Sequence, residues 1–202
     1  MAQKSYYSQS QIEWLWKSNK DPWSSTEQEE WSNFHDVETA IIEDAFQKKL
    51  SEVLLDNYHI DFKRSLQISN NNESHQRPIK RVDKTNSTTE TRLREARFMP
   101  NPINPSTPFT SQTNLLMFVG EFLTYYNLFG DSSLRDPNNR RMVIEKAAEG
   151  IITEGKLVGS QKEAEWIAEQ LLKTVDGTDQ EIWQCCAHLY TMESFLYKKM
   201  NE

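Results

Sequence analysis

Three stretches decide the fold of this chain: Trp14-Leu15-Trp16, Tyr58-His59-Ile60-Asp61-Phe62 and Arg77-Pro78-Ile79-Lys80-Arg81. In the first two, large apolar side chains occupy every second position, and Ile12 extends the first pattern by one step. A period of two is typical of a strand that buries one face. The three stretches therefore predict strands of one sheet.

A helix is predicted between the first and second of these stretches. Asp36 is a suitable N-cap, and apolar residues follow at helical spacing up to about residue 49. These apolar residues are Val37, Ile41, Ile42, Ala45 and Phe46. Glu43 lies beside their stripe. One helix combined with several short antiparallel strands predicts an α+β fold.

Turns and loops separate the predicted strands. Asp21-Pro22 predicts a turn after the first strand, and residues 24–30, with three glutamates and no large apolar side chain, predict a loop. The buried pattern resumes at residues 31–34. Residues 66–68 predict another strand, and the three asparagines at 70–72 predict the tip of a hairpin that returns through the last stretch.

Together these landmarks resemble a WWE domain, a small module named for two tryptophans and one glutamate. The resemblance covers about residues 11–83 and implies a half-barrel of strands packed on one helix. It makes Trp14, Trp31 and Glu43 the structural signature. Many members of the family bind the iso-ADP-ribose unit of poly(ADP-ribose). The partner that the resemblance implies is therefore poly(ADP-ribose) or an ADP-ribosylated protein.

The resemblance also implies four ligand-binding residues, Trp16, Tyr58, Gln67 and Arg77. Gln67 follows Tyr58 by nine residues and Arg77 precedes Arg81 by four, in register with the family pattern. Their chemistry agrees with this role. Trp16 or Tyr58 offers a flat surface for adenine, where stacking contributes about 1–3 kcal/mol per base. Gln67 can both donate and accept a hydrogen bond, and Arg77 presents a planar fork to a phosphate.

Trp31, Lys80 and Arg81 are further ligand contacts that the resemblance implies. The chain also departs from the family pattern at three points. Trp16 replaces the commoner tyrosine, Asn19 stands where some members carry a basic residue, and the loop at 24–30 adds negative charge. We expect these departures to weaken or alter the binding of a polyanion rather than abolish it.

The composition divides the chain into four parts. Residues 1–10 are polar and predict a flexible N-terminus, ahead of the WWE-like domain at 11–83. Residues 84–109 are polar and then proline-rich, which predicts a linker. Residues 110–202 carry helical periodicity throughout and predict a small all-α domain.

Four helices are predicted in this last domain. The first has an apolar face and ends at Gly130. The second begins at Asp136-Pro137, an N-cap with proline in the first turn, and ends at Gly155. Ser160 and Thr178, each followed three residues later by glutamate, predict capping boxes that open the other two helices.

Three short motifs lie near the end of the chain: Ala187-His188-Leu189-Tyr190-Thr191, Leu196-Tyr197 and Lys199-Met200-Asn201. They are similar to the end of the N-terminal helical subdomain of arginine-specific mono-ADP-ribosyltransferases. In those enzymes the residues around NAD lie further downstream, so the catalytic part is expected to be absent, and NAD is a cofactor only if that part follows. Glu27-Gln28-Glu29 and Glu163-Ala164-Glu165 match the enzymes' Glu-x-Glu motif by chance, because neither follows the required strands.

Composition sets limits on the class of protein. A net charge of −7 argues against affinity for duplex nucleic acid. No apolar run approaches the roughly 18–20 residues that span a bilayer, and the start lacks a signal peptide, which together predict an intracellular protein, cytoplasmic or nuclear. Cys185 and Cys186 are helix neighbours whose side chains diverge, so a structural disulfide is not expected. The four histidines have no paired metal spacing, and no metal site or catalytic residue is predicted.

The sequence therefore predicts a binding module that recognises poly(ADP-ribose) through its iso-ADP-ribose unit, attached to a helical domain. Two alternatives remain open. The chain is the non-catalytic N-terminal part, or a truncated copy, of an NAD-dependent protein-arginine mono-ADP-ribosyltransferase, or it is a protein-interaction adaptor in ubiquitin and ADP-ribose signalling. The adaptor alternative places a protein partner on the helical domain.

Overall fold

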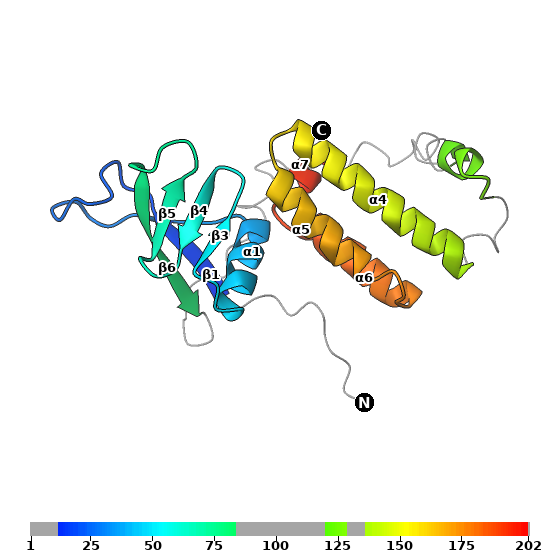
Figure 1. Cartoon of the computed structure of the whole chain (residues 1–202), viewed down its shortest axis with the longest axis horizontal. Helices are drawn as coiled ribbons and strands as arrows, with labels where there is room; N and C mark the ends of the chain where they lie inside the picture. Colours follow the sequence, from blue (N-terminus) through cyan, green and yellow to red (C-terminus); the bar gives the residue numbers. More distant parts are fainter. Residues whose placement is uncertain (1–11, 84–119, 129–135, 202) are drawn as a thin grey trace, which may run out of the picture.

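The structure is a computed structural model that describes residues 12–83, 120–128 and 136–201 of the chain (Figure 1). Its N-terminal unit is a six-stranded antiparallel sheet with the strand order β2-β1-β6-β5-β4-β3. The strands are β1 (Ile12–Lys17), β2 (Trp31–Asn33), β3 (Glu52–Leu54), β4 (Tyr58–Asp61), β5 (Leu66–Ser69) and β6 (Gln76–Asp83). With one helix packed on the sheet, the predicted α+β fold is confirmed. The sequence did not predict β3, because this strand has only three residues and only one of them, Val53, is not exposed.

Helix α1 (Asp36–Gln47) lies between the sheet and the C-terminal helices (Figure 1). One side of α1 contributes Ile42 to the core of the sheet, where it packs with Trp14, Phe34, Leu55, Ile60 and Ile79. The other side contributes Val37 to the core of the helices, and Ile41 touches both clusters. The helix therefore belongs to two hydrophobic cores at once.

The prediction that Asp36 caps α1 is wrong. The N-cap is His35, and Asp36 is the first residue of the helix. The Asp36 carboxylate instead accepts a hydrogen bond of 2.9 Å from the backbone amide of Glu193, far along the chain. The Asp36 side chain therefore makes a long-range contact with the C-terminal region and does not cap its own helix.

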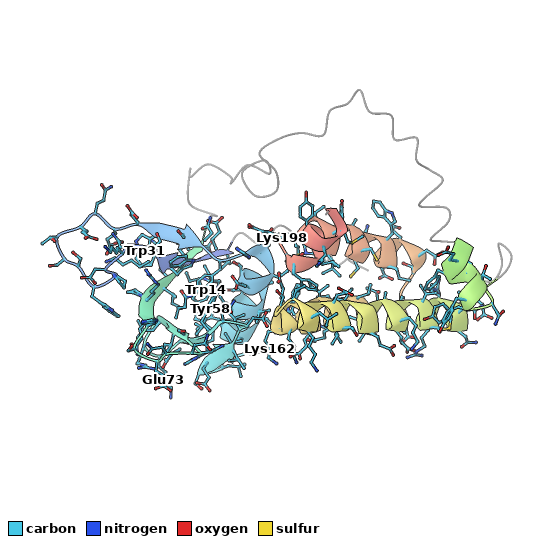
Figure 2. The ribbon with its side chains drawn as sticks, turned by 90° about the horizontal axis from the view of Figure 1, so that it is seen from above. Trp14, Trp31, Tyr58, Glu73, Lys162 and Lys198 are labelled. Carbon is cyan, nitrogen blue, oxygen red and sulfur yellow. The ribbon has the colours of Figure 1, made fainter. Side chains whose placement is uncertain are left out.

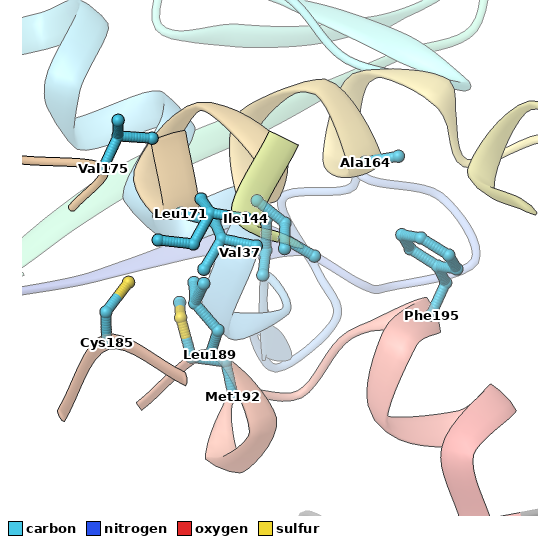
Figure 3. Close-up of a cluster of buried hydrophobic side chains, with 10 residues drawn as sticks. Val37, Ile144, Ala164, Leu171, Val175, Cys185, Leu189, Met192 and Phe195 are labelled. Carbon is cyan, nitrogen blue, oxygen red and sulfur yellow. The ribbon is translucent and has the colours of Figure 1, made fainter. Parts of the chain in front are cut away.

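The C-terminal region is helical, as predicted. Its helices are α4 (Pro137–Leu157), α5 (Gln161–Leu172), α6 (Asp179–Thr191) and α7 (Phe195–Asn201), and residues 120–125 are also helical. Asp136 caps α4 as expected, and Thr178 and Glu181 form the predicted capping box of α6. The core, shown in Figure 3, gathers side chains from α1 and all four of these labelled helices: Val37, Ile144, Ala164, Ile167, Leu171, Val175, Cys185, Leu189, Met192 and Phe195.

Gly155 does not end α4, contrary to prediction, because the helix continues to Leu157. Its role is close packing. A Cβ atom at this position would lie 2.2 Å from the Cβ of Ala164 and 3.2 Å from Cζ of Phe195. The missing side chain lets α4 approach α5 and α7. The left-handed residue that follows the helix is Gly159, with φ +76°.

We expect Gly155→Ala to lower the free energy of unfolding by about 2–3 kcal/mol, because the added methyl forces the packed helices apart. Gly150→Ala in the same helix is the matched control. A Cβ there meets nothing within 4 Å, so alanine should raise stability by up to about 1 kcal/mol through helix propensity. Urea unfolding of both variants measures the difference. Equal effects would show that the close helix contact at Gly155 is not formed.

The sheet unit and the helices are joined at the start of α5. Ser160 makes no capping bond with its side chain, so the capping box predicted there is wrong. Asp56, in the turn between β3 and β4, takes its place: its carboxylate accepts hydrogen bonds from the backbone amides of Lys162, at 2.7 Å, and Glu163, at 3.3 Å. Figure 2 shows Lys162 next to the sheet unit. A carboxylate at a helix N-terminus also interacts favourably with the helix dipole.

Some predictions lie outside the described residues. These are the flexible N-terminus at 1–10, the linker at 84–109, the start of the helix predicted before residue 120, and its end at Gly130. Among the helices of the described ranges, none combines the length and the apolar character needed to cross a membrane.

Candidate ligand-binding site

The four residues predicted to bind ligand form one row across the sheet. Side chains that face each other in an antiparallel pair point to the same side. Trp16 pairs with Ile79, Arg77 lies two residues before Ile79, and Gln67 pairs with Arg77. On the next strand Gln67 pairs with Ile60, which lies two residues after Tyr58. The row Trp16, Arg77, Gln67 and Tyr58 therefore runs over β1, β6, β5 and β4 on the face that carries the core, and all four side chains are half-buried.

Arg77 is held in place by one nitrogen of its guanidinium group. Nη1 donates to the backbone carbonyls of Lys17, at 2.9 Å, and Asn19, at 2.8 Å. The guanidinium carbon lies 5.4 Å from the centre of the Trp16 ring, within the range of a cation–π contact. Within the described ranges no hydrogen bond uses Nε or Nη2. The edge formed by these two nitrogens is the one that binds a phosphate through two bonds.

Gln67 has an unused acceptor. Its Oε1 is buried and has no hydrogen-bond partner in the described part of the chain. A buried acceptor without a partner costs about 1–3 kcal/mol, so native proteins rarely keep one. A ligand with a hydrogen-bond donor at this point would satisfy it.

Tyr58 is held by α1, which packs on the same face of the sheet. Its hydroxyl donates a short hydrogen bond to Oε1 of Glu38, and its ring packs against Phe34 with the ring centres 5.9 Å apart. Burial, together with the nearby Glu38 carboxylate, raises the pKa of Tyr58 well above its usual range. Tyr58 is therefore a neutral, oriented ring at neutral pH.

On the same face of the sheet as this row, one carboxylate connects the sheet to α1. Glu43 accepts 2.9 Å hydrogen bonds from Nε1 of Trp14 and from Nε of Arg81, and a 2.7 Å bond from Nη2 of Arg81. Burial alone would raise the pKa of Glu43, but the bonds from Arg81, Gln47 and Trp14 outweigh it and lower the pKa below its usual range. A tryptophan on the first strand and a glutamate on the helix are thus joined by direct contact.

A family model of the WWE domain matches residues 12–81. This part of the chain is a WWE domain. The helical region has no family assignment, and the chain matches no curated protein. Trp14 and Glu43, predicted as signature residues, form the contact that fixes helix and sheet in the WWE domain, and Arg81 completes it.

The other predicted ligand contacts of the WWE domain lie apart from the row. Trp31 pairs with Lys17, and Lys80 pairs with Leu15, so both point to the opposite face of the sheet from Trp16. There the Lys80 ammonium lies 4.0 Å from the centre of the Trp31 ring. Figure 2 shows Trp31 towards the loop between β1 and β2, whereas Trp14 and Tyr58 lie near α1. Arg81 is occupied by Glu43.

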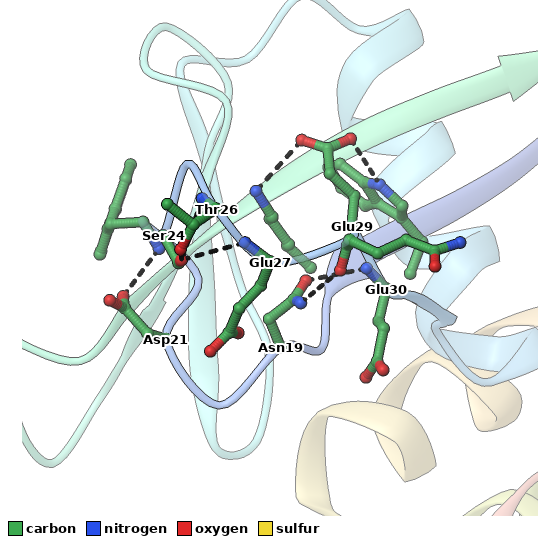
Figure 4. Close-up of polar contacts among 11 residues, drawn as sticks. Asn19, Asp21, Ser24, Thr26, Glu27, Glu29 and Glu30 are labelled. Carbon is green, nitrogen blue, oxygen red and sulfur yellow. Dashed lines mark hydrogen bonds and ion pairs between the residues drawn. The ribbon is translucent and has the colours of Figure 1, made fainter.

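The loop between β1 and β2 is organised by Asn19, which stands where some members of the family carry a basic residue (Figure 4). Asn19 is buried, donates a 2.8 Å hydrogen bond to the carbonyl of Gln28, and accepts one of 2.8 Å from the amide of Glu30. Glu29 is paired with Lys17 at 3.1 Å, and hydrogen bonds from Lys17 and Trp31 lower its pKa. Part of the negative charge of this loop is therefore offset by Lys17 at the end of β1.

Sequence reasoning missed two residues that support the site. Glu38 orients Tyr58, and Asp56 ties the WWE domain to α5. Glu38 carries one local signal, because its carboxylate also accepts from the amide of His35 three residues earlier. The contacts of Asp56 join residues more than a hundred positions apart and have no local signal. Among the described residues, no group of three or more His, Cys, Asp or Glu side chains is placed to hold a metal ion.

Glu163 makes folding dependent on pH. Burial raises its pKa to about 7, with further contributions from Glu38 and Asp56, and its carboxylate accepts a 3.2 Å bond from the amide of Phe195. Because the folded chain holds this proton more tightly than the unfolded chain, stability should fall by on the order of 2–3 kcal/mol as pH rises from about 4.5 to about 7. Glu163→Gln should lack this loss and be more stable than wild type at pH 8, but not at pH 4.5. Denaturation of both proteins across this range measures it, and parallel curves would contradict it.

Proposed function

We propose that the WWE domain binds poly(ADP-ribose) through its iso-ADP-ribose unit, at the row formed by Trp16, Arg77, Gln67 and Tyr58. The observation that carries this proposal is the buried, unpartnered Oε1 of Gln67 between an oriented arginine and an oriented tyrosine. A ligand that donates a hydrogen bond to this oxygen would remove the cost of leaving it unpaired.

Each member of the row has a chemical counterpart in the ligand. Trp16 and Tyr58 offer aromatic surface to adenine, and Gln67 offers both a donor and an acceptor to polar groups of the nucleoside. Arg77 offers its free Nε and Nη2 edge to a phosphate, and the two bonds made by Nη1 hold that edge in place before binding. We leave Trp31, Lys80 and Arg81 outside the proposed site, because the first two point to the other face and Arg81 is held by Glu43.

Titration calorimetry tests this proposal on the whole chain, with iso-ADP-ribose and mono-ADP-ribose at low and physiological salt. The expected result is micromolar binding of iso-ADP-ribose and much weaker binding of mono-ADP-ribose. A lack of binding to both compounds would contradict the proposal and leave the WWE match as a statement about fold.

For the helical region we propose a supporting role. It shares a core with α1 and receives the carboxylate of Asp56 at the start of α5, so it buttresses the helix that carries Glu38 and Glu43. No observation favours the alternative that the chain is part of an ADP-ribosyltransferase, because the helical region matches no family. The domain boundaries at 83 and 110 and an intracellular location remain proposals.

A further inference from the structure

The loop between β1 and β2 presents an aromatic ring to solvent. Trp23 is 60 % exposed, and its backbone amide donates a 2.9 Å hydrogen bond to Oδ1 of Asp21. Buried Asn19, near the start of the loop, is hydrogen-bonded to Gln28 and Glu30 near its end. These bonds fix the two ends of the loop that carries Trp23. Glu27 and Glu30 are exposed on the same loop (Figure 4). The loop therefore combines an exposed indole with acidic groups.

A groove of complementary character lies at the C-terminal end of α1. It has a volume of 470 Å³, and its lining is Phe46, Gln47, Lys49, Leu50, Ser51, Phe62 and Lys63. Phe46 and Leu50 are 41 % and 49 % exposed. Phe46 packs edge-on against Trp14 and at a tilt against Phe62, with 5.4 and 5.8 Å between ring centres. The groove is thus a preformed apolar surface that water covers in the isolated chain.

Two lysines give the groove a positive rim. Lys49 adopts a left-handed conformation, φ 57°, in the turn that ends α1, where the amide of Leu50 bonds to the carbonyl of Ala45 and that of Lys49 to Phe46. Glycine would adopt this conformation with less strain. Lys49 and Lys63 form no ion pair within the described ranges, whereas their neighbour Lys48 is paired with Asp44. No acidic residue lines the groove.

We propose that the loop of one copy of this chain binds the groove of a second copy, with the indole of Trp23 against Phe46, Leu50 and Phe62. Asp21 and Glu27 then face Lys49 and Lys63. The loop lies at the outer end of the sheet, away from α1 (Figure 1), and Trp23 is exposed in the structure, so one molecule does not fill its own groove. Because loop and groove are different surfaces, the contact is head-to-tail and each added copy leaves one of each free.

The contact is expected to be weak and sensitive to salt. One tryptophan buries roughly 200 Å². The surface area buried by such a contact is well below the area buried in a stable complex, so we expect a dissociation constant on the order of 100 µM. The charged rim is exposed, so added salt should weaken association further. Association should grow beyond dimers as the concentration of the chain rises.

Sedimentation velocity with the whole chain and two variants tests the proposal. Trp23→Ser removes the anchor and keeps the groove, while the double variant Lys49→Glu, Lys63→Glu alters the groove and keeps the loop. Each alone should associate at least tenfold more weakly than wild type, and an equimolar mixture should form dimers but nothing larger. Circular dichroism and iso-ADP-ribose titration, which should match wild type, serve as folding controls.

Three results would overturn the proposal: wild type that stays monomeric up to about five times the expected dissociation constant, single variants that associate as wild type does, or a mixture that stays monomeric while wild type associates. A monomeric wild type would leave the groove to a different partner, such as an acidic peptide from another protein.

Discussion

Arg77→Ala should reduce the affinity for iso-ADP-ribose by about 10- to 100-fold, because a charge-assisted hydrogen bond to phosphate contributes about 1.5–3 kcal/mol. The effect is expected to be large since this arginine is already oriented by the carbonyls of Lys17 and Asn19. A flexible arginine would lose conformational freedom on binding, and Arg77 loses little. Titration calorimetry measures the change directly.

Two further variants separate geometry from charge. Arg77→Lys keeps the positive charge but loses the planar fork, and it should bind nearly as poorly as the alanine variant. Arg64→Ala removes an exposed arginine that pairs with Asp61, and it should bind as wild type does. If Arg64→Ala and Arg77→Ala weaken binding equally, the affinity depends on the net charge of the domain and the proposed site is wrong.

Glu43→Ala should lower the free energy of unfolding by about 3 kcal/mol, because it leaves the indole N–H of buried Trp14 and the guanidinium of Arg81 without their acceptor. The loss should come from both partners at once, since one carboxylate satisfies both. Alanine has a higher helix propensity than glutamate, so propensity does not explain a loss of stability.

Asp44→Ala, the next residue on the same helix, is the matched control. Its carboxylate forms an exposed ion pair with Lys48, and such pairs contribute roughly 0.5 kcal/mol. Chemical denaturation of both variants should therefore separate them by more than about 2 kcal/mol. Equal stabilities would mean that the Trp14–Glu43–Arg81 contact does not hold the helix to the sheet.

Much of the fold was predictable because its signals are local. The alternating Trp14 and Trp16 indicate a strand with one buried face, and the spacing from Val37 to Phe46 indicates a helix. Position 155 shows where this reasoning fails: glycine is typical of a helix end, but here it accommodates Ala164 and Phe195 from other helices. Likewise, the serine and glutamate of a capping box are present at the start of α5. The backbone amides there donate instead to Asp56, which lies in a turn that is distant in sequence.

The members of the candidate site remain a prediction from the family resemblance, and the residues that support them were not predicted. Trp16, Tyr58, Gln67 and Arg77 were identified through a family resemblance, and the strand register brings them into one row. That Glu38 orients Tyr58 and that Gln67 lacks a partner depends on how α1 and β5 are placed in space. No periodicity in the sequence carries that information.

Gln67→Leu is the sharpest test of the proposed site, because opposite effects on stability and on binding are expected. Leucine removes the buried, unpartnered Oε1, so the free energy of unfolding should rise by about 1 kcal/mol. The same change removes the ligand's polar partner, so titration with iso-ADP-ribose should show at least a tenfold loss of affinity. A more stable variant that no longer binds would support a glutamine kept for its ligand, and a variant that binds as tightly as wild type would contradict the proposed site.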